Sequence, residues 1–257
     1  MKKIFALMLA VLMVMSVFAG CGSSKSDNEL NLVEKGKLIM STNAAFPPYE
    51  MTDDNGKFIG IDVEIAQAIA DKLGLELVID NMEFTAALEA AQKGKSDMVM
   101  AGVTVDPDRQ MVMDFSNSYA KGVQVVIVPE NTTITKIEDL EGKKIGTQMG
   151  TTGYLYCTDD YGDENVVAYD NGITAVQALL KGQIDCVVID NAPAQAFVKE
   201  NAGLKILDTE YAVEDYAIGL KKGNTALKDA INKALAELIA DGTVQKIVDK
   251  YIPAEQK

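Results

Sequence analysis

The chain has 257 residues, with 38 acidic and 24 basic side chains and no histidine or tryptophan. The net charge of −14 argues against nucleic acid or an anionic membrane surface as a partner, because both bind basic patches. Without histidine, Ser-His-Asp and Cys-His catalysis and an ordinary zinc site are excluded. The length fits one large domain or two small ones.

Residues 1–20 have the layout of a secretory signal peptide. Met1-Lys2-Lys3 is positively charged, and the apolar run over 4–18 is too short for a comfortable membrane span. The run ends in Phe18-Ala19-Gly20-Cys21, which resembles a bacterial lipobox, so we expect Cys21 to be lipidated, with palmitate as the acyl group. Phe18 is an unusual residue at its position, which leaves an ordinary cleaved signal peptide as the alternative.

Residues 21–34 are predicted to be a tether. Gly22 to Asn28 is polar and rich in serine, a composition typical of flexible linkers. A lipid-anchored domain needs such a spacer to stand clear of the membrane. The sequence therefore predicts an exported protein anchored by lipid to the outer face of the cell membrane.

From residue 35 onward, short β-rich runs alternate with amphipathic helical stretches. The first half predicts the strand Lys37–Thr42, a helix over Asp62–Leu73 ended by Gly74, the strand Leu75–Ile79, a helix over Thr85–Lys93 ended by Gly94, and the buried strand Asp97–Val103. This alternation is typical of βαβ units and a mostly parallel sheet.

The second half repeats the scheme. It predicts strands at Lys143–Gln148, Val166–Tyr169 and Cys186–Ile189, and helices at Thr152–Asp160 and Thr174–Lys181. Residues 90–99 and 178–187 share a Lys-Gly helix end, two further residues, an aspartate and a buried strand. The echo indicates either two similar lobes or a common helix-to-strand connector.

Two strand-like segments, Gly122–Pro129 and Tyr216–Leu220, are candidates for crossovers between the halves. The helices Thr225–Ala240 and Thr243–Tyr251 would then return to the first lobe. This arrangement predicts lobe 1 over residues 35–121 plus 217–257, lobe 2 over 122–216, and a cleft between them.

The predicted strands end in loops that carry candidate binding residues. In open α/β sheets, ligands bind beyond the carboxyl ends of the strands. Those ends, at 43–50, 81–84, 101–109, 148–152 and 190–191, hold aromatic rings, one arginine, hydroxyls and carboxylates. An α-amino acid needs such a set: a guanidinium for its carboxylate, an acid for its ammonium, and aromatic faces for its side chain.

The segment Gly60-Ile61-Asp62-Val63-Glu64-Ile65, followed by Ile69-Ala70 and Leu73, resembles the signature of the family 3 extracellular solute-binding proteins. The resemblance covers about residues 32–252. It implies a periplasmic-binding-protein-like α/β fold whose two lobes are joined by two hinge crossovers (type II topology). It also implies a monomer without cofactor or metal that captures a polar amino acid by hinge closure and delivers it to an ABC transporter permease.

The same resemblance implies roles for individual residues. Arg109 and the Thr104 N–H would bind the ligand carboxylate, and Thr152 would add a donor from the opposite lobe. Asp190, the Gly102 carbonyl and the Thr104 hydroxyl would bind the ammonium. The alternatives are a helix-start ion pair for Arg109, and helix capping for Asp190 and Thr152.

Phe46 and Phe84 match the family's aromatic clamp on the ligand side chain, although they could be ordinary core residues. Asn43 stands where family members that resemble basic or glutamine binders tend to carry aspartate, and Gln148 stands where the family varies with its substrate. Their neutral amides suit a neutral polar ligand rather than an acidic one. Glu83 could still recruit a basic ligand.

Two other functions fit the same scaffold: a sensing module for a membrane receptor, and a periplasmic dehydratase-type enzyme. The enzyme would need an acid in the cleft, and Glu83 is the candidate. The acidic run 159–164 does not have calcium-loop spacing. Cys157 and Cys186 are expected to be buried free thiols, with a disulfide as the alternative.

Overall fold

The computed structural model describes residues 30–252. The predicted signal peptide, Cys21 and most of the tether lie outside the described residues. The strands are β1 Lys37–Thr42, β2 Met51–Thr52, β3 Phe58–Ile59, β4 Glu76–Asn81, β5 Met98–Val99, β6 Met113–Pro129, β7 Ile145–Gln148, β8 Val166–Tyr169, β9 Cys186–Asp190, β10 Leu204–Ile206 and β11 Ala212–Lys221. The helices are α1 Ile61–Leu73, α2 Phe84–Lys93, α3 Pro107–Val112, α4 Thr152–Tyr161, α5 Gly172–Leu180, α6 Asn191–Glu200, α7 Thr225–Ala240 and α8 Thr243–Tyr251, with short 3₁₀ helices at Ile137–Leu140 and Asp163–Asn165.

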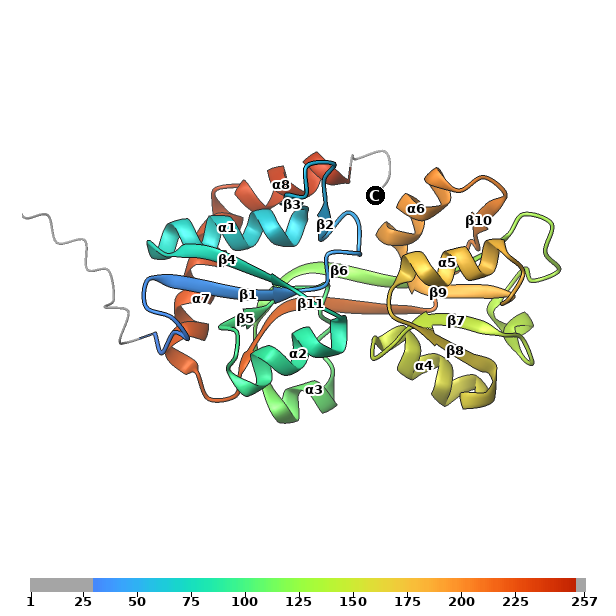
Figure 1. The fold of residues 1–257 in the computed structure, drawn as a ribbon, viewed down its shortest axis with the longest axis horizontal. Coiled ribbons are helices and arrows are strands. Elements are labelled where there is room, and N and C mark those ends of the chain that lie inside the picture. Colours follow the sequence, from blue (N-terminus) through green and yellow to red (C-terminus); the bar gives the residue numbers. More distant parts are fainter. Residues whose placement is uncertain (1–29, 253–257) are drawn as a thin grey trace, which may run out of the picture.

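The main sheet has the strand order β4-β1-β5-β11-β6-β9-β7-β8, and β10 pairs with β6. At one end β1 pairs in parallel with β4 and β5, and at the other β7 pairs in parallel with β8 and β9. The long strands β6 and β11 lie antiparallel between these two regions. Figure 1 shows them running through the middle of the molecule, from one lobe into the other. The predicted two-lobed α/β fold with two crossovers is therefore confirmed.

Helices cover both faces of each half of the sheet. In the first lobe α1, α7 and α8 pack together on one face, and α2 and α3 lie on the other (Figure 1). In the second lobe α5 and α6 lie opposite α4. Separate clusters of buried apolar side chains lie beneath α2 and beneath α4.

Cys157 and Cys186 belong to the cluster beneath α4, where both are buried free thiols. Burial raises the pKa of Cys157 to about 12.

The predicted strand Asp97–Val103 is wrong in its second half, because the strand β5 spans only Met98–Val99. The chain turns at Gly102, which has a φ of 56°, and the Gly102 N–H donates to Asp62 Oδ2 at 3.0 Å. The buried apolar residues after Val99 thus belong to a packed loop that leads to Thr104. The two crossing strands are longer than predicted, and the hairpin β2–β3, the helix α3 and the strand β10 were not predicted.

The first residue of the signature segment, Gly60, has a backbone conformation and a close contact that only glycine allows. Its φ of 130° begins α1, and a Cβ at this position would lie 2.2 Å from the Tyr49 carbonyl oxygen. Two residues later, Asp62 is fully buried and accepts hydrogen bonds from Gly102 and from the Tyr119 hydroxyl at 2.8 Å. Asp62 of the signature segment therefore fixes the position of the loop at Gly102 through a hydrogen bond to the loop backbone.

Gly60→Ala is expected to lower the free energy of unfolding by about 2–4 kcal/mol, from backbone strain and overpacking together. Urea denaturation followed by circular dichroism measures this change. Gly56→Ala is the matched control, because Gly56 also has a positive φ, 79°, but a Cβ there meets no atom within 4 Å. Equal losses in both variants would show that contact with Tyr49 is not the cause.

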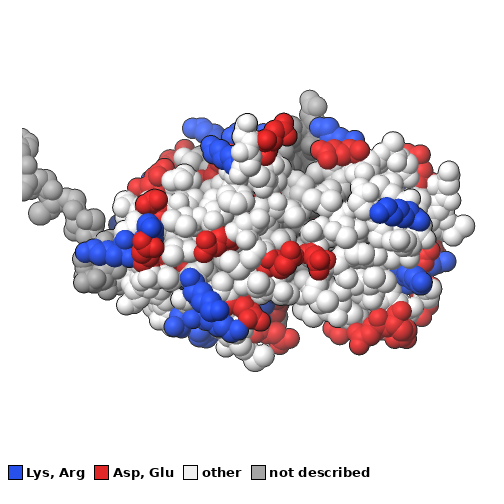
Figure 2. Space-filling view, viewed as in Figure 1, with Lys and Arg blue, Asp and Glu red and all other residues white. Residues whose placement is uncertain are grey.

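The surface carries mixed charge. On the face in Figure 2, basic side chains occur in small groups among acidic ones rather than in one broad patch. Among residues 30–252, no helix has the length and apolar character needed to cross a membrane. Within the same residues, no group of three or more histidine, cysteine, aspartate or glutamate side chains is placed to hold a metal ion.

Candidate ligand-binding site

A polar pocket lies where the two lobes meet, with an empty volume of about 440 Å³ that includes solvent at its mouth. It is lined by Asn43, Phe46, Glu50, Phe84, Ala101, Gly102, Thr104, Arg109, Gln124, Gln148, Thr151, Thr152, Val188, Ile189 and Asp190. All nine candidate residues from the sequence are in this set. Their contacts with a ligand stay a prediction.

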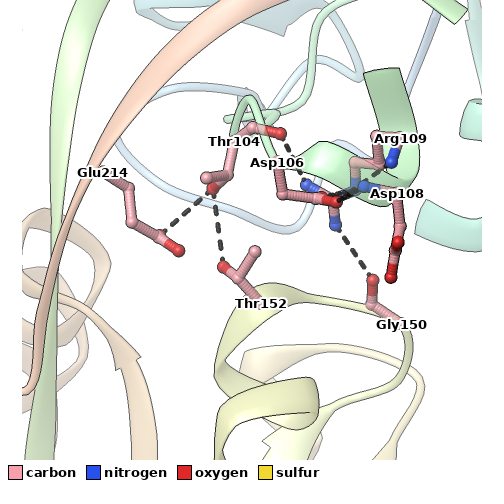
Figure 3. Close-up of polar contacts among 7 residues, drawn as sticks. All are labelled: Thr104, Asp106, Asp108, Arg109, Gly150, Thr152 and Glu214. Atoms are coloured by element: carbon pink, nitrogen blue, oxygen red, sulfur yellow. Dashed lines mark hydrogen bonds and ion pairs between the residues drawn. The ribbon is translucent and has the colours of Figure 1, made fainter. Parts of the chain in front are cut away.

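Arg109 is the only arginine in the 257 residues, and its guanidinium lies between the lobes (Figure 3). Nη1 donates to the Thr104 carbonyl at 2.9 Å, and Nη2 donates to the Gly150 carbonyl at 3.1 Å. Nε pairs with Asp106 Oδ2 at 3.1 Å. The helix-start ion pair thus exists, but it also orients the fork of the guanidinium. Such a fork suits bidentate binding of a carboxylate.

Asp106 is the residue that begins this arrangement. It caps α3 by accepting from the backbone N–H groups of Asp108 and Arg109 at 2.9 and 3.0 Å. Pro107 follows as the first helical residue, a position that proline favours. The sequence Asp106-Pro107-Asp108-Arg109 therefore builds a short helix whose third residue is turned into the pocket.

Several hydrogen bonds join the lobes directly across the pocket. Gln148 Nε2 donates to Asn43 Oδ1 at 3.0 Å, and the hydroxyls of Thr104 and Thr152 are 3.5 Å apart (Figure 3). The capping alternative for Thr152 is wrong, because Thr151 is the N-cap of α4 and accepts from Tyr154 N at 3.2 Å. Thr152 is instead turned toward the first lobe.

Asp190, the last residue of β9, supplies a buried carboxylate. It accepts from Gln124 Nε2 at 2.9 Å and from the Tyr216 hydroxyl. Its side chain makes no capping hydrogen bond to α6, so the capping alternative is wrong. Burial raises the pKa of Asp190 to about 7, with Tyr216 and Gln124 opposing the rise and the Glu214 carboxylate adding to it. An ammonium group would compensate this buried charge.

The remaining wall of the pocket suits the ligand side chain. Phe46 and Phe84 are 7 % and 6 % exposed, and Arg109 Cζ lies 5.5 Å from the centroid of the Phe84 ring. Asn43 Nδ2 donates to the Met82 carbonyl at 2.9 Å, which fixes the amide with its oxygen toward Gln148. Glu83, the acid considered from the sequence, is exposed and does not line the pocket.

The sequence analysis did not identify three buried polar residues at or next to the pocket: Glu50, Gln124 and Glu214. Glu50 is fully buried at the pocket, and burial, together with the nearby Asp62, raises its pKa well above the usual value. Gln124 on β6 and Glu214 on β11 are also buried. The signal that could have found them is a charged or amide residue at an inward position of an otherwise apolar segment.

Two α/β lobes, a double crossover and a polar pocket between the lobes are typical of a solute-binding protein. The model of the bacterial extracellular solute-binding proteins, family 3, matches residues 38–254, so the chain belongs to this family. The L-cystine-binding protein TcyJ of Escherichia coli (strain K12) is 31% identical over 249 residues, which cover 95% of this chain and 94% of that protein.

Solved structures agree with this assignment. An ancestral arginine-binding protein bound to glutamine is 41% identical, with a TM-score of 0.81 over 85% of this chain and 98% of the other. An ancestral arginine-binding protein bound to arginine is 42% identical, with a TM-score of 0.79 over 84% and 98%.

The chain is therefore an extracytoplasmic protein that captures a polar amino acid for import by an ABC transporter, and it is not an enzyme. Relatives named as ABC transporter arginine-binding and glutamine-binding proteins favour import over the dehydratase and receptor-module alternatives.

Proposed function

We propose that the captured amino acid is arginine. The observation that carries this proposal is Glu50, which lines the pocket and accepts no hydrogen bond from an N–H group of the described residues. Its neighbour there is the Asp62 carboxyl, which together with burial raises the pKa of Glu50. A guanidinium supplies five donors and a positive charge, so its binding would favour release of the proton that burial and Asp62 keep on Glu50. The ancestral proteins bound to arginine and to glutamine add support, since both ligands end in N–H donors.

In this proposal different residues of the pocket bind the carboxylate, the ammonium and the side chain of the ligand. Arg109 and the Thr104 N–H bind the carboxylate, with Thr152 closing over it from the second lobe. Asp190, the Gly102 carbonyl and the Thr104 hydroxyl bind the ammonium. Closure excludes water and so strengthens each charged contact.

Phe46 and Phe84 clamp the aliphatic part of the side chain, and Asn43, Gln148 and Glu50 accept from the guanidinium. The closed, monomeric protein is then presented to the permease.

We further propose that a lipid on Cys21, including palmitate, anchors the protein to the outer face of the membrane after removal of residues 1–20. Recovery of the native protein in the aqueous phase after detergent partitioning would contradict the anchor.

Calorimetric titration of residues 22–257 with arginine, glutamine and cystine tests the ligand. We expect arginine to bind most tightly and to raise the unfolding temperature most, because stabilisation follows occupancy. At a ligand concentration of 100 Kd the gain is about 2.7 kcal/mol. Preference for glutamine or for cystine, or no binding by arginine, would overturn the proposal; preference for glutamine would in addition assign the amide pair Asn43–Gln148 as the decisive contact.

Asn43→Asp is expected to raise the ratio of arginine to glutamine affinity by about tenfold, because a charge at the side-chain end favours a cation by roughly 1–2 kcal/mol. The same titrations measure this ratio. Asn81→Asp is the matched control: Asn81 is exposed, accepts from Ala44 N at 2.8 Å through Oδ1, and does not line the pocket. An unchanged ratio in Asn43→Asp would remove Asn43 from the side-chain contacts.

A further inference from the structure

Glu214 is a buried carboxylate on the crossing strand β11, only 5 % exposed, that lies behind the pocket without lining it. Its Oε2 accepts from the Thr104 hydroxyl at 3.1 Å and from Gln124 Nε2 at 3.0 Å. Figure 3 shows dashed contacts from the Thr104 hydroxyl to both Glu214 and Thr152. The carboxylate therefore touches two residues that do line the pocket.

The contact with Thr104 decides which way its hydroxyl is turned. A hydroxyl has one hydrogen and two acceptor lone pairs, and a carboxylate only accepts. Because the Thr104 hydrogen is donated to Glu214, Thr104 offers only its lone pairs to the pocket side, where one of them faces the Thr152 hydroxyl at 3.5 Å and the other remains for a ligand. An ammonium group needs acceptors, so this orientation is the productive one for an α-amino acid.

The contact with Gln124 extends the same effect to Asp190. The Gln124 amide has two hydrogens on Nε2, and they go to Asp190 Oδ2 at 2.9 Å and to Glu214 Oε2 at 3.0 Å. This double donation fixes the amide with its nitrogen between the two acids. Asp190, held also by the Tyr216 hydroxyl, is thereby positioned at the pocket wall.

We propose that Glu214 is a positioning residue of the ammonium subsite: it turns the Thr104 hydroxyl into an acceptor for the ligand ammonium and, through Gln124, holds Asp190 in place. The inference rests on the proposed function, because it requires that the pocket bind an α-amino acid. Glu214 itself does not touch the ligand.

Calorimetric titration of Glu214→Leu and Glu214→Gln with the amino acid that binds the wild type tests the proposal. Glu214→Leu removes the acceptor and is expected to weaken binding about 30-fold, the range of a buried hydrogen-bonding group left unpaired. Glu214→Gln keeps an acceptor oxygen and is expected to bind within about fivefold of the wild type. Asp215→Leu, at the exposed neighbouring residue, is the control and is expected to change affinity less than about twofold.

A double-mutant cycle separates positioning from a general structural effect. In a Thr104→Val background the loss caused by Glu214→Leu should shrink to less than about fivefold, because part of the effect acts through the missing hydroxyl. An undiminished loss in that background overturns the proposal. A loss of affinity above tenfold in Glu214→Gln also overturns the proposal, because it would assign the effect to the charge of Glu214. This second criterion can be applied even if Glu214→Leu does not fold.

The wild-type titration separates this proposal from the proposed function. If the wild type binds no amino acid, the proposed function is wrong. If the wild type binds an amino acid and Glu214→Leu binds it equally well, only the role of Glu214 is wrong.

Discussion

Arg109→Ala is expected to weaken amino-acid binding by roughly 100-fold or more while the protein stays folded, because truncating one partner of a buried charge pair costs about 2–5 kcal/mol. The side chain is 11 % exposed, and its donors meet backbone carbonyls of both lobes, so no other residue replaces its fork. Calorimetric titration measures the affinity, and thermal unfolding without ligand checks the fold. Binding within a few-fold of the wild type would remove Arg109 from the site.

Arg109→Lys sharpens this prediction. Lysine keeps the charge but lacks the planar fork, so we expect a loss intermediate between wild type and alanine. Because the chain has a single arginine, phenylglyoxal offers an independent readout on the unmodified protein. A bound amino acid without a guanidinium of its own should protect Arg109 from the reagent, since free arginine would consume it. Equal reaction with and without such a ligand would contradict a direct contact.

Asp190→Asn is expected to weaken binding by roughly 100-fold, because the ammonium loses its buried charged partner. It should also flatten the pH dependence of binding. In the wild type a proton competes with the ammonium for Asp190, whose pKa is raised to about 7 chiefly by burial. Affinity is therefore expected to rise from pH 5.5 to 8, by up to about tenfold per unit below pH 7.

The ligand-free protein should show the opposite trend. A carboxyl whose pKa is raised by folding contributes stability that is present at low pH and is lost as pH rises through its folded pKa, here about 7. Removing this charge should make ligand-free Asp190→Asn more stable than the wild type above pH 7. Burial also raises the pKa of Asp62, to about 6, so the difference between wild type and variant isolates Asp190.

Asp170→Asn is the matched control for both measurements. Asp170 is exposed in the same lobe, and its backbone carbonyl accepts from Gln148 Nε2 at 3.2 Å. Its substitution should change affinity less than about twofold and leave the pH profile intact, since exposed charges contribute little. A similar loss in both variants would mean that overall charge, rather than the contact at Asp190, controls binding.

The sequence by itself determined the local elements and their ends. Gly74 and Gly94 end helices α1 and α2 with a φ of 70° each, as glycine after a helix predicts. The predicted strands also fix where their carboxyl ends lie. Because parallel strands run in the same direction, these ends lie at the same edge of the sheet. For that reason the pattern of strands and loops alone assigns candidates as far apart in sequence as Asn43 and Asp190 to one pocket, and both line it.

Only the tertiary structure decided how Thr104 and Asp190 are supported. The pairing of β6 with β11 brings Gln124 and Glu214, 90 positions apart, within hydrogen-bond distance, and local patterns carry no information on such a register. The same holds for Glu50, which lines the pocket next to Tyr49, whose carbonyl accepts from the Asp62 N–H at the start of α1 at 2.9 Å. The sequence specifies which groups lie at strand ends, whereas long-range packing selects which buried acids face them.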